Sequence, residues 1–363
     1  MPEPLKNLYN EKFFRSLVRS FQSVYVNFDA EGFMTRIYDD QWENRELKDR
    51  LRHITRSLHA TIALPYRETL EILKPVAAQQ RYGFECMFFP DFVELYGMHD
   101  WEASLPALEF FTRFSSSEFA IRPFILAQPE RMMMQMREWS THENEHVRRL
   151  ASEGCRPRLP WAIALPAFKK DPSLIFPILE NLKADPSLYV RKSVANNLND
   201  ISKDHPQRVL ETAENWIGTH AHTDWILKRA CRTLLKNGDT RALMLFGFGN
   251  PYTVEARNLQ VLPKLLQMGE EISFSFEVIH HSPQPQKLRI EYALGFVKAN
   301  GSLSRKIFQI TENFFEGGKP FSFTKKYTFR DMTTRKHYPG EHKIAILVNG
   351  EEKITTVFAV ENK

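Results

Sequence analysis

The residues best suited to chemistry in this chain are acids placed between arginines. Glu153 follows Arg149 by four positions and precedes Arg156 by three, so a helix would carry all three on one face. Glu118, in SSSEFAIRPF, and Asp200, at the end of VANNLND, are further acids at the edges of predicted helices. Carboxylates fixed near a group that becomes positive stabilise that charge, and arginines bind phosphate or carboxylate.

Each of these candidates also has an ordinary structural explanation. The acid between the arginines can be a surface salt-bridge ladder, which contributes little to stability. A serine among residues 115–117 can cap a helix whose first turn holds Glu118. Asp200 can be a surface acid, although the helix dipole disfavours an acid at a C-terminus. Trp161, in LPWAIALPAF, either packs in the core or offers an indole face to a cation.

A basic stripe surrounds the central acid on a chain whose net charge is only +5. Such a stripe on a nearly neutral body favours a localised contact with a polyanion, while a solvated helix face is the alternative. Apart from Glu153, the charged residues between 147 and 170 are all basic: Arg148, Arg149, Arg156, Arg158, Lys169 and Lys170.

One short motif raises a different possibility, a zinc hydrolase. His142 and His146 frame the sequence HENEH, which matches the HExxH pattern of zinc-binding helices. Against zinc, Glu145 puts a charge at a middle position, the motif lies at the start of a short predicted helix, and no third ligand follows at a fixed distance. A polar helix start is the favoured interpretation, and no metal site is predicted.

The elements that must position these residues are helical repeats. HVRRLASEGC, from His146, and YVRKSVANNL, from Tyr189, share a β-branched residue, two basic residues and then small or apolar ones, at a spacing of 43. A weaker third copy, WILKRACRTLL, follows 36 residues later. Repeats of roughly 40 residues built from helix pairs are typical of HEAT-type solenoids, in which neighbouring repeats stack to bury a continuous core.

Helical periodicity dominates as far as residue 236, and strand periodicity follows. The spacing of apolar residues predicts helices near 13–21, 43–62, 66–80, 101–113, 117–137, 143–154, 161–169, 173–183, 187–201, 206–217 and 222–236. Beyond a glycine-rich linker, about seven alternating segments predict strands, and Asn300-Gly301 and Asn349-Gly350 predict hairpin turns. We therefore expect a HEAT-like α-solenoid of antiparallel helix pairs (residues 1–245) and an all-β immunoglobulin-like sandwich (246–363).

Composition narrows the class of protein further. The three cysteines are widely separated and form no CxxC, which argues against a disulfide framework or zinc ribbon and suits a reducing cytosol. The sequence has no apolar run near the roughly 20 residues that cross a bilayer, and no signal-peptide pattern at its start. Without a P-loop, GxGxxG or cysteine cluster, no cofactor is expected. These features predict a cytoplasmic protein.

Two stretches carry a resemblance to a known family. WSTHENEHVRRLASEGCRPRLPWA and DPSLYVRKSVANNLNDISKDHP resemble the HEAT-repeat alkylpurine DNA glycosylases of the AlkC type, over roughly residues 1–245, and the sandwich resembles a domain that only some members have. The resemblance implies removal of cationic alkylated bases, chiefly 3-methyladenine and 3-methylcytosine, from double-stranded DNA without base flipping. By this match Glu118, Glu153, Trp161 and Asp200 line the lesion, and Arg149 and Arg156 hold it and the adjacent backbone.

The same resemblance implies how the acids act. A base methylated at N3 is already cationic, so it leaves without protonation, and the remaining barrier is positive charge on the deoxyribose. The three acids are expected to be catalytic, and Arg148 and Arg158 are expected to add contacts to DNA. A monomer without membrane contact is expected. The alternative class is a non-enzymatic HEAT-repeat scaffold that binds nucleic acid or protein.

Overall fold

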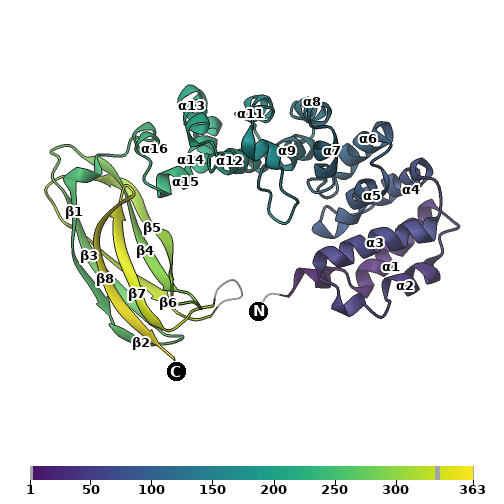
Figure 1. Cartoon of the computed structure of the whole chain (residues 1–363). Coiled ribbons are helices and arrows are strands. Elements are labelled where there is room, and N and C mark those ends of the chain that lie inside the picture. The colour runs from purple at the N-terminus through teal and green to yellow at the C-terminus, as the bar shows by residue number, and fades with distance from the viewer. Residues whose placement is uncertain (1–2, 332–335, 363) are drawn as a thin grey trace. The chain divides into compact units, whose positions relative to one another are not determined.

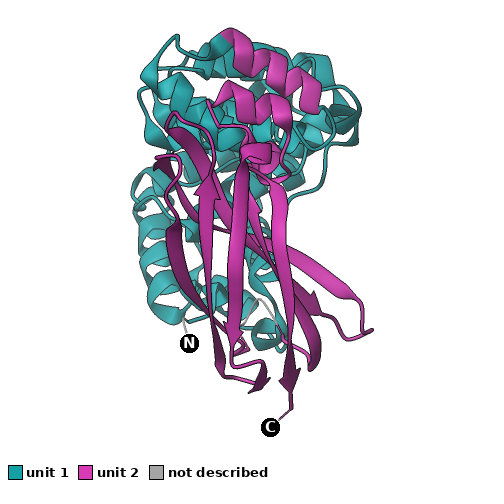
Figure 2. Cartoon of the chain, turned by 90° about the vertical axis from the view of Figure 1, so that its left-hand side faces the viewer, with its two compact units in different colours: residues 1–205, 216–230 teal, residues 206–215, 231–363 magenta. Residues whose placement is uncertain are grey.

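The structure, a computed structural model, describes residues 3–331 and 336–362 of the chain (Figure 1). The described chain divides into two compact units that are interleaved in sequence (Figure 2). Residues 1–205 and 216–230 form the helical unit, and residues 206–215 and 231–363 form the unit that contains the sandwich. The expected domain boundary between residues 245 and 246 stays a prediction.

The N-terminal helices form because apolar residues recur at helical spacing and pack against one another. In α3 (Leu47–Ile62), Ile54, Leu58 and Ile62 are almost fully buried. The short α2 (Ala30–Ile37) was not predicted from the sequence, since eight residues are too few to show a helical period. The other helices of this part are α1 (Glu11–Val24), α2 (Ala30–Ile37), α4 (Tyr66–Ala78), α5 (Phe88–Tyr96) and α6 (Trp101–Phe111).

The three repeat copies begin alike in space as well as in sequence. Val147 in α9 (Glu145–Gly154), Val190 in α12 (Leu188–Ile201) and Ile226 in α14 (Ala221–Ala230) have no exposed surface. Helix α12 packs against both α9 and α14. Within the helical unit, α8 (Pro129–Trp139) and α11 (Phe176–Leu182) form a second row beside α9 and α12 (Figure 1).

Three predicted helices differ from those in the structure. The segment 117–137 is divided into α7 (Arg122–Ala127) and α8, because Pro129 starts a new helix. The segment 161–169 is helical only as α10 (Pro166–Lys170), and residues 157–165 form a loop. The segment 222–236 is divided into α14 and α15 (Arg232–Lys236). The remaining helices are α13 (Pro206–Trp216) and α16 (Thr240–Leu245).

The sandwich consists of two sheets around an apolar core. The three-stranded sheet has the order β1-β3-β6, and the five-stranded sheet has the order β2-β8-β7-β4-β5. Buried residues of both sheets meet in one cluster, for example Phe274 with Ile290 and Ile346. The strands are β1 (Val254–Leu262), β2 (Leu265–Gln267), β3 (Glu271–His280), β4 (Gln286–Val297), β5 (Leu303–Phe315), β6 (Phe321–Thr328), β7 (Gly340–Val348) and β8 (Glu351–Glu361).

The sequence predicted seven of these strands and missed β2, which has three residues and pairs in parallel with β8. Both predicted Asn-Gly turns join neighbouring antiparallel strands, and Asn349 and Gly350 have the positive φ that such a turn requires. The predicted fold class, a helical part followed by an immunoglobulin-like sandwich, is confirmed.

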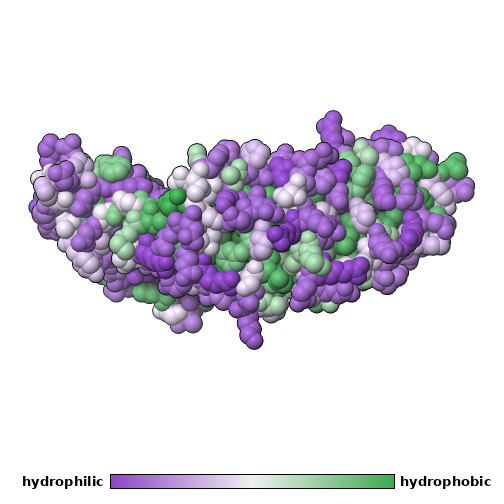
Figure 3. Space-filling view, turned by 90° about the horizontal axis from the view of Figure 1, so that it is seen from above, coloured by the Kyte–Doolittle hydropathy of each residue, from purple (hydrophilic) through white to green (hydrophobic). Residues whose placement is uncertain are grey.

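Other predictions concern the surface and the cysteines. The cysteines Cys86, Cys155 and Cys231 are free and buried. In the described residues, no helix has both the length and the apolar composition to cross a membrane. On the face shown in Figure 3, hydrophilic residues predominate and apolar residues appear as small patches between them.

Candidate active site

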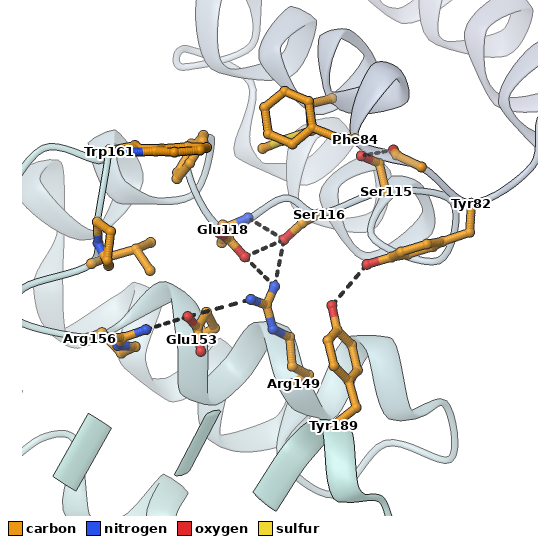
Figure 4. A pocket seen from close by; sticks show the side chains of 15 residues that line it. Tyr82, Phe84, Ser115, Ser116, Glu118, Arg149, Glu153, Arg156, Trp161 and Tyr189 are labelled. Carbon is orange, nitrogen blue, oxygen red and sulfur yellow. Dashed lines mark hydrogen bonds and ion pairs between the residues drawn. The ribbon is translucent and has the colours of Figure 1, made fainter. Parts of the chain in front are cut away.

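A cavity of about 400 Å³ in the helical unit gathers most of the acids and arginines singled out above. Four segments line it: residues 82–87 after α4, residues 115–119 before α7, residues 149–161 from α9 and the following loop, and Tyr189 at the start of α12. Glu118, Glu153, Arg149, Arg156 and Trp161 all line the cavity. Figure 4 shows Glu118 between the aromatic rings of the upper wall and the charged residues of α9.

Arg149 connects the two acids of the cavity. Its Nη1 forms an ion pair with Glu118 and donates to the Ser116 hydroxyl at 2.8 Å, and its Nη2 lies 3.5 Å from Glu153 Oε1 (Figure 4). Ser116 also donates to Glu118 at 2.7 Å. The guanidinium therefore fixes two carboxylates that are 35 residues apart in the sequence, and both face the same space.

Arg156 continues this ion network toward Asp200. Its Nη1 donates to Glu153 Oε1 at 2.6 Å, and its Nε donates to Asp200 Oδ2 at 2.9 Å. Lys203 binds the other Asp200 oxygen at 3.1 Å. Asp200 is 3 % exposed, so it is not a surface acid, and it does not line the cavity. Its two cationic partners offset the unfavourable helix dipole at this position.

The electrostatics of the cavity follow from this pairing. Burial alone would lower the pKa of Arg149, but the carboxylates of Glu118 and Glu153 raise it above its usual value, so the guanidinium stays charged. Burial raises the pKa of the Tyr189 hydroxyl, against the opposing effect of Arg149. The Arg149 guanidinium lies 5.0 Å from the centre of the Tyr189 ring, a cation–π contact that holds it over α12.

Aromatic rings form the other walls of the cavity. Trp161 is 62 % exposed, which excludes a role in core packing, and its ring lies 6.5 Å from that of Phe84 in an edge-to-face arrangement. Tyr82 and Tyr189 share a hydrogen bond of 2.9 Å between their hydroxyl groups. A flat or cationic group in this cavity would therefore meet π faces on one side and charged groups on the other.

The loop that carries Glu118 is fixed by its serines in a way the sequence did not predict. Ser115 donates to the Gly83 carbonyl at 2.9 Å, and Ser117 donates to the Leu108 carbonyl at 2.7 Å. Residues 118–121 form a turn, and α7 begins only at Arg122. The alternative explanation of Glu118, a place in the first turn of a helix capped by a serine, is therefore wrong, because Ser115 and Ser117 bind neighbouring segments instead.

Two arginines of the basic stripe lie outside the cavity. Arg148 pairs with Asp185 at 2.7 Å and donates to the carbonyls of His142 and Glu143 at 2.9 and 2.7 Å. Arg158 pairs with Asp204 at 2.7 Å, with about a third of its side chain exposed. Arg148 thus braces the turn before α9. The DNA contacts expected of both arginines stay predictions.

The geometry of the HENEH segment does not match that of a zinc-binding helix. His142 lies in the turn before α9, where its Nδ1 accepts from the Asn144 amide at 2.9 Å. His146 lies within α9 and packs against the rings of Tyr82 and Tyr189. The HExxH mechanism requires both histidines on one helix face, and this face is not formed.

The lining residues that sequence reasoning did not assign to the site include Tyr82, Phe84, Ser116 and Tyr189. Tyr189 and Ser116 lie in stretches that the sequence singled out: Tyr189 matches His146 in the repeat, and Ser116 is one of the possible caps beside Glu118. Tyr82 and Phe84 lie in a segment without a repeat or motif. They reach the cavity because the 82–87 and 115–119 segments bind each other through Gly83 and residues 114–115.

The chain is similar to known proteins over almost its whole length. A model described as "DNA alkylation repair enzyme" matches residues 112–234, and one described as "YhaZ, C-terminal Ig-like domain" matches residues 255–362. The chain is 49 % identical over 356 residues to the uncharacterized protein YhaZ of Bacillus subtilis, covering 98 % of this chain and 99 % of the relative. It also matches Pseudomonas fluorescens alkylpurine DNA glycosylase AlkC bound to DNA containing an abasic site analog, with a TM-score of 0.95, 43 % identity and coverage of 99 % and 100 % of the two chains.

Proposed function

This chain belongs to the AlkC-like family of alkylpurine DNA glycosylases, and we propose that it excises cationic alkylated bases, chiefly 3-methyladenine and 3-methylcytosine, from double-stranded DNA. Membership of the family makes it a DNA glycosylase of alkylation repair. The choice of lesion and the roles of individual residues are our proposal. The observation that carries it is the cavity in which Glu118 and Glu153 face the same space as the exposed Trp161.

The chemistry of the lesion explains why a cavity with carboxylates and no general acid suffices to cleave the N-glycosidic bond. A base methylated at N3 carries a positive charge, so it departs with the bonding electrons and needs no general acid. As the N-glycosidic bond stretches, positive charge moves onto the deoxyribose. Carboxylates already fixed near that sugar stabilise the charge without reorganisation, as acids do in glycoside hydrolysis generally. A carboxylate hydrogen-bonded to water also orients it for attack on the sugar carbon.

We assign the acids different positions relative to the sugar. Glu118 and Glu153 line the cavity and act on the sugar and the attacking water. Asp200 lies behind Arg156, and it holds this arginine in place from the far side of the ion network. The water-activating role falls to Glu118 or Glu153, because only these two acids of the network face the cavity.

The arginines of the cavity make the charge that the carboxylates present to the sugar depend on DNA binding. In the free protein, Arg149 neutralises Glu118 and Glu153. A DNA phosphate competes for the same guanidinium, since arginine binds phosphate and carboxylate with similar geometry. When Arg149 turns toward the phosphate, the Glu118 carboxylate loses this counterion, and its charge acts on the sugar instead. Arg158, with its partly exposed side chain, is a second phosphate contact.

Trp161 is proposed to place an aromatic face against the cationic base or sugar. Its ring is exposed, so it can contact a lesion that remains in the base stack. A ring buried in a closed pocket would instead require the base to be flipped out of the duplex. The chemistry requires no cofactor, because the cationic base is itself the good leaving group.

The test is release of free bases from duplex DNA treated with a methylating agent. We expect 3-methyladenine and 3-methylcytosine among the products, measured by chromatography and mass spectrometry, and no release from untreated duplex. Binding to the duplex without release of either base would overturn the proposal and favour the non-enzymatic scaffold. Release dominated by an uncharged lesion would contradict the leaving-group argument.

A further inference from the structure

The loop that presents Trp161 is held in an unusual backbone conformation. Trp161 has φ = 65°, in the left-handed region that residues other than glycine rarely adopt. Such conformations persist only where the surroundings enforce them. The side chain does not supply the restraint, since 62 % of its surface is exposed and its ring contact is the edge-to-face approach to Phe84. The restraint must therefore act on the loop backbone.

One restraint comes from below the loop, through Arg122 at the start of α7. Arg122 has no exposed surface, and its guanidinium donates to three backbone carbonyls: Ile163 at 2.6 Å, Gly154 at 2.7 Å and Arg156 at 3.0 Å. These carbonyls lie on both sides of Trp161 in the chain. Arg122 thus ties the two ends of the loop together. Within the tip, the Ala162 amide donates to the Leu159 carbonyl at 3.3 Å and closes a turn over Pro160 and Trp161, so the direction of this turn is what another group can still set.

The second restraint comes from a helix far away in the sequence. Lys48, in α3, donates from Nζ to the carbonyl oxygen of Trp161 itself at 2.7 Å, across 113 residues. Its ammonium also lies 5.3 Å from the centre of the Phe119 ring, and Phe119 lines the cavity beside Glu118. Lys48 therefore joins the N-terminal helices, the Glu118 loop and the Trp161 loop at one point.

We propose that Lys48 is a positioning residue of the glycosylase reaction, and that its bond to the Trp161 carbonyl sets the indole over the cavity. This proposal rests on the proposed function for its kinetic part but not for its structural part. The hydrogen bond is to the backbone of the residue whose φ is unfavourable, so it stabilises the one conformation that presents the ring. Without it the tip keeps only the turn hydrogen bond from Ala162 to Leu159, and the indole turns away from Phe84.

The chemistry of Lys48 suggests a competing role, because an exposed lysine beside a DNA-binding cavity also binds phosphate. The two roles differ in what they change. A phosphate contact contributes to DNA affinity and its salt dependence, whatever residue stands at position 161. A positioning residue changes turnover, and its effect disappears when the indole is absent.

The kinetic experiment is a double-mutant cycle with Lys48→Met and Trp161→Ala in the full chain, measured under single turnover on methylated duplex. We expect Lys48→Met to lower the rate constant about fivefold to tenfold, because this factor corresponds to the loss of one hydrogen bond. The DNA affinity should remain nearly unchanged. In the Trp161→Ala background the same substitution should have no effect. Lys48→Arg, which keeps a donor, should restore most of the rate. Lys74→Met, an equal loss of charge on α4, is the matched control.

A spectroscopic experiment tests the structural part without any activity. The chain is labelled with 5-fluorotryptophan, and the ¹⁹F resonance of Trp161 is assigned by its absence in Trp161→Phe. We expect Lys48→Met to shift or broaden that resonance and leave those of the other five tryptophans in place, whereas Lys74→Met should change none. An unmoved resonance, or a loss of rate that persists without the indole, would overturn the proposal. If the wild-type chain releases no base but the resonance moves, the proposed function fails and the structural link stands.

Discussion

Two copies of the same repeat, α9 with its following loop and α12, have the same frame but different chemistry. Val147 and Val190 are both fully buried. Arg148 donates to the carbonyls of residues 142 and 143, and Arg191 donates to those of Asp185 and Pro186, at distances between 2.7 and 2.9 Å. The first basic residue of the repeat, Arg148 or Arg191, thus fixes the turn before its helix in both copies.

The two copies differ at the positions that follow Arg148 and Arg191. At the repeat spacing of 43, Arg149, Glu153 and Arg156 correspond to Lys192, Asn196 and Asn199. The first set forms the ion network of the cavity, while Lys192 is exposed and none of the second set lines the cavity. The comparison teaches that the repeat supplies a rigid frame, and that the chemistry comes from three side chains placed on one copy of it.

The largest expected effect is on turnover and comes from Glu153, an acid that the second copy of the repeat lacks. Glu153→Gln should lower turnover by about 10²–10³-fold, because the amide keeps the shape but loses the charge that stabilises the sugar cation. Asp200→Asn should also lower turnover more than DNA affinity, through its hold on Arg156. Asn196→Asp, an acid change at the matching position, should leave the rate unchanged. Single-turnover rates and binding isotherms check all three, and equal losses of rate and affinity would assign the acids to binding.

The next largest effect concerns Arg156, which is the counterion of both Glu153 and Asp200. Arg156→Met leaves Glu153 and Asp200, 5 % and 3 % exposed, without the arginine between them. Removing one partner of a buried ion pair costs about 3–5 kcal/mol, and the remaining contacts to Arg149 and Lys203 place this case at the low end. Hydrogen exchange of amides in α9 and α12 measures the loss of stability. Unchanged protection would mean that the charges of the two acids are compensated without Arg156.

A smaller effect should be common to both copies. Arg148→Met and Arg191→Met each remove donors to two carbonyls, and each should cost about 1–3 kcal/mol. Arg148→Met should cost more, since it also leaves the buried Asp185 without its ion pair. Denaturant unfolding followed by helical signal measures both, and activity should survive below the transition. A loss of DNA affinity in Arg148→Met alone would show that this arginine binds the duplex.

The smallest effect is a pH dependence at the first position of the repeat. Burial lowers the pKa of His146, with Arg149 adding to the shift and Glu145 opposing it. The unfolded chain therefore takes up a proton more readily, and stability is lost as pH falls through the unfolded pKa of about 6.5. His146→Phe should remove this loss. The melting temperature of the variant should therefore rise relative to that of the wild type as the pH is lowered from 8 to 5.5. A constant difference across that range would exclude the titration of His146.

The sequence determined the parts of this protein that depend on local pattern. Periodicity of apolar residues predicted the helices and the change to strands, the spacing of Val147 and Val190 predicted the repeat, and Asn349-Gly350 predicted a turn. The step of four from Arg149 to Glu153 placed both on one helix face. These inferences hold because helical and strand geometry is fixed over a few residues.

Only the tertiary structure decided which residues meet across long stretches of chain. Periodicity carries no information on how separate segments pack, so it could not place Tyr82 beside Tyr189 or Lys48 on the carbonyl of Trp161. It also could not decide whether Asp200 is a surface acid or a buried one, because the burial of an acid depends on the cations that surround it. One of its two cationic partners, Arg156, lies 44 residues away in the sequence, and this pairing could not be read from a local pattern.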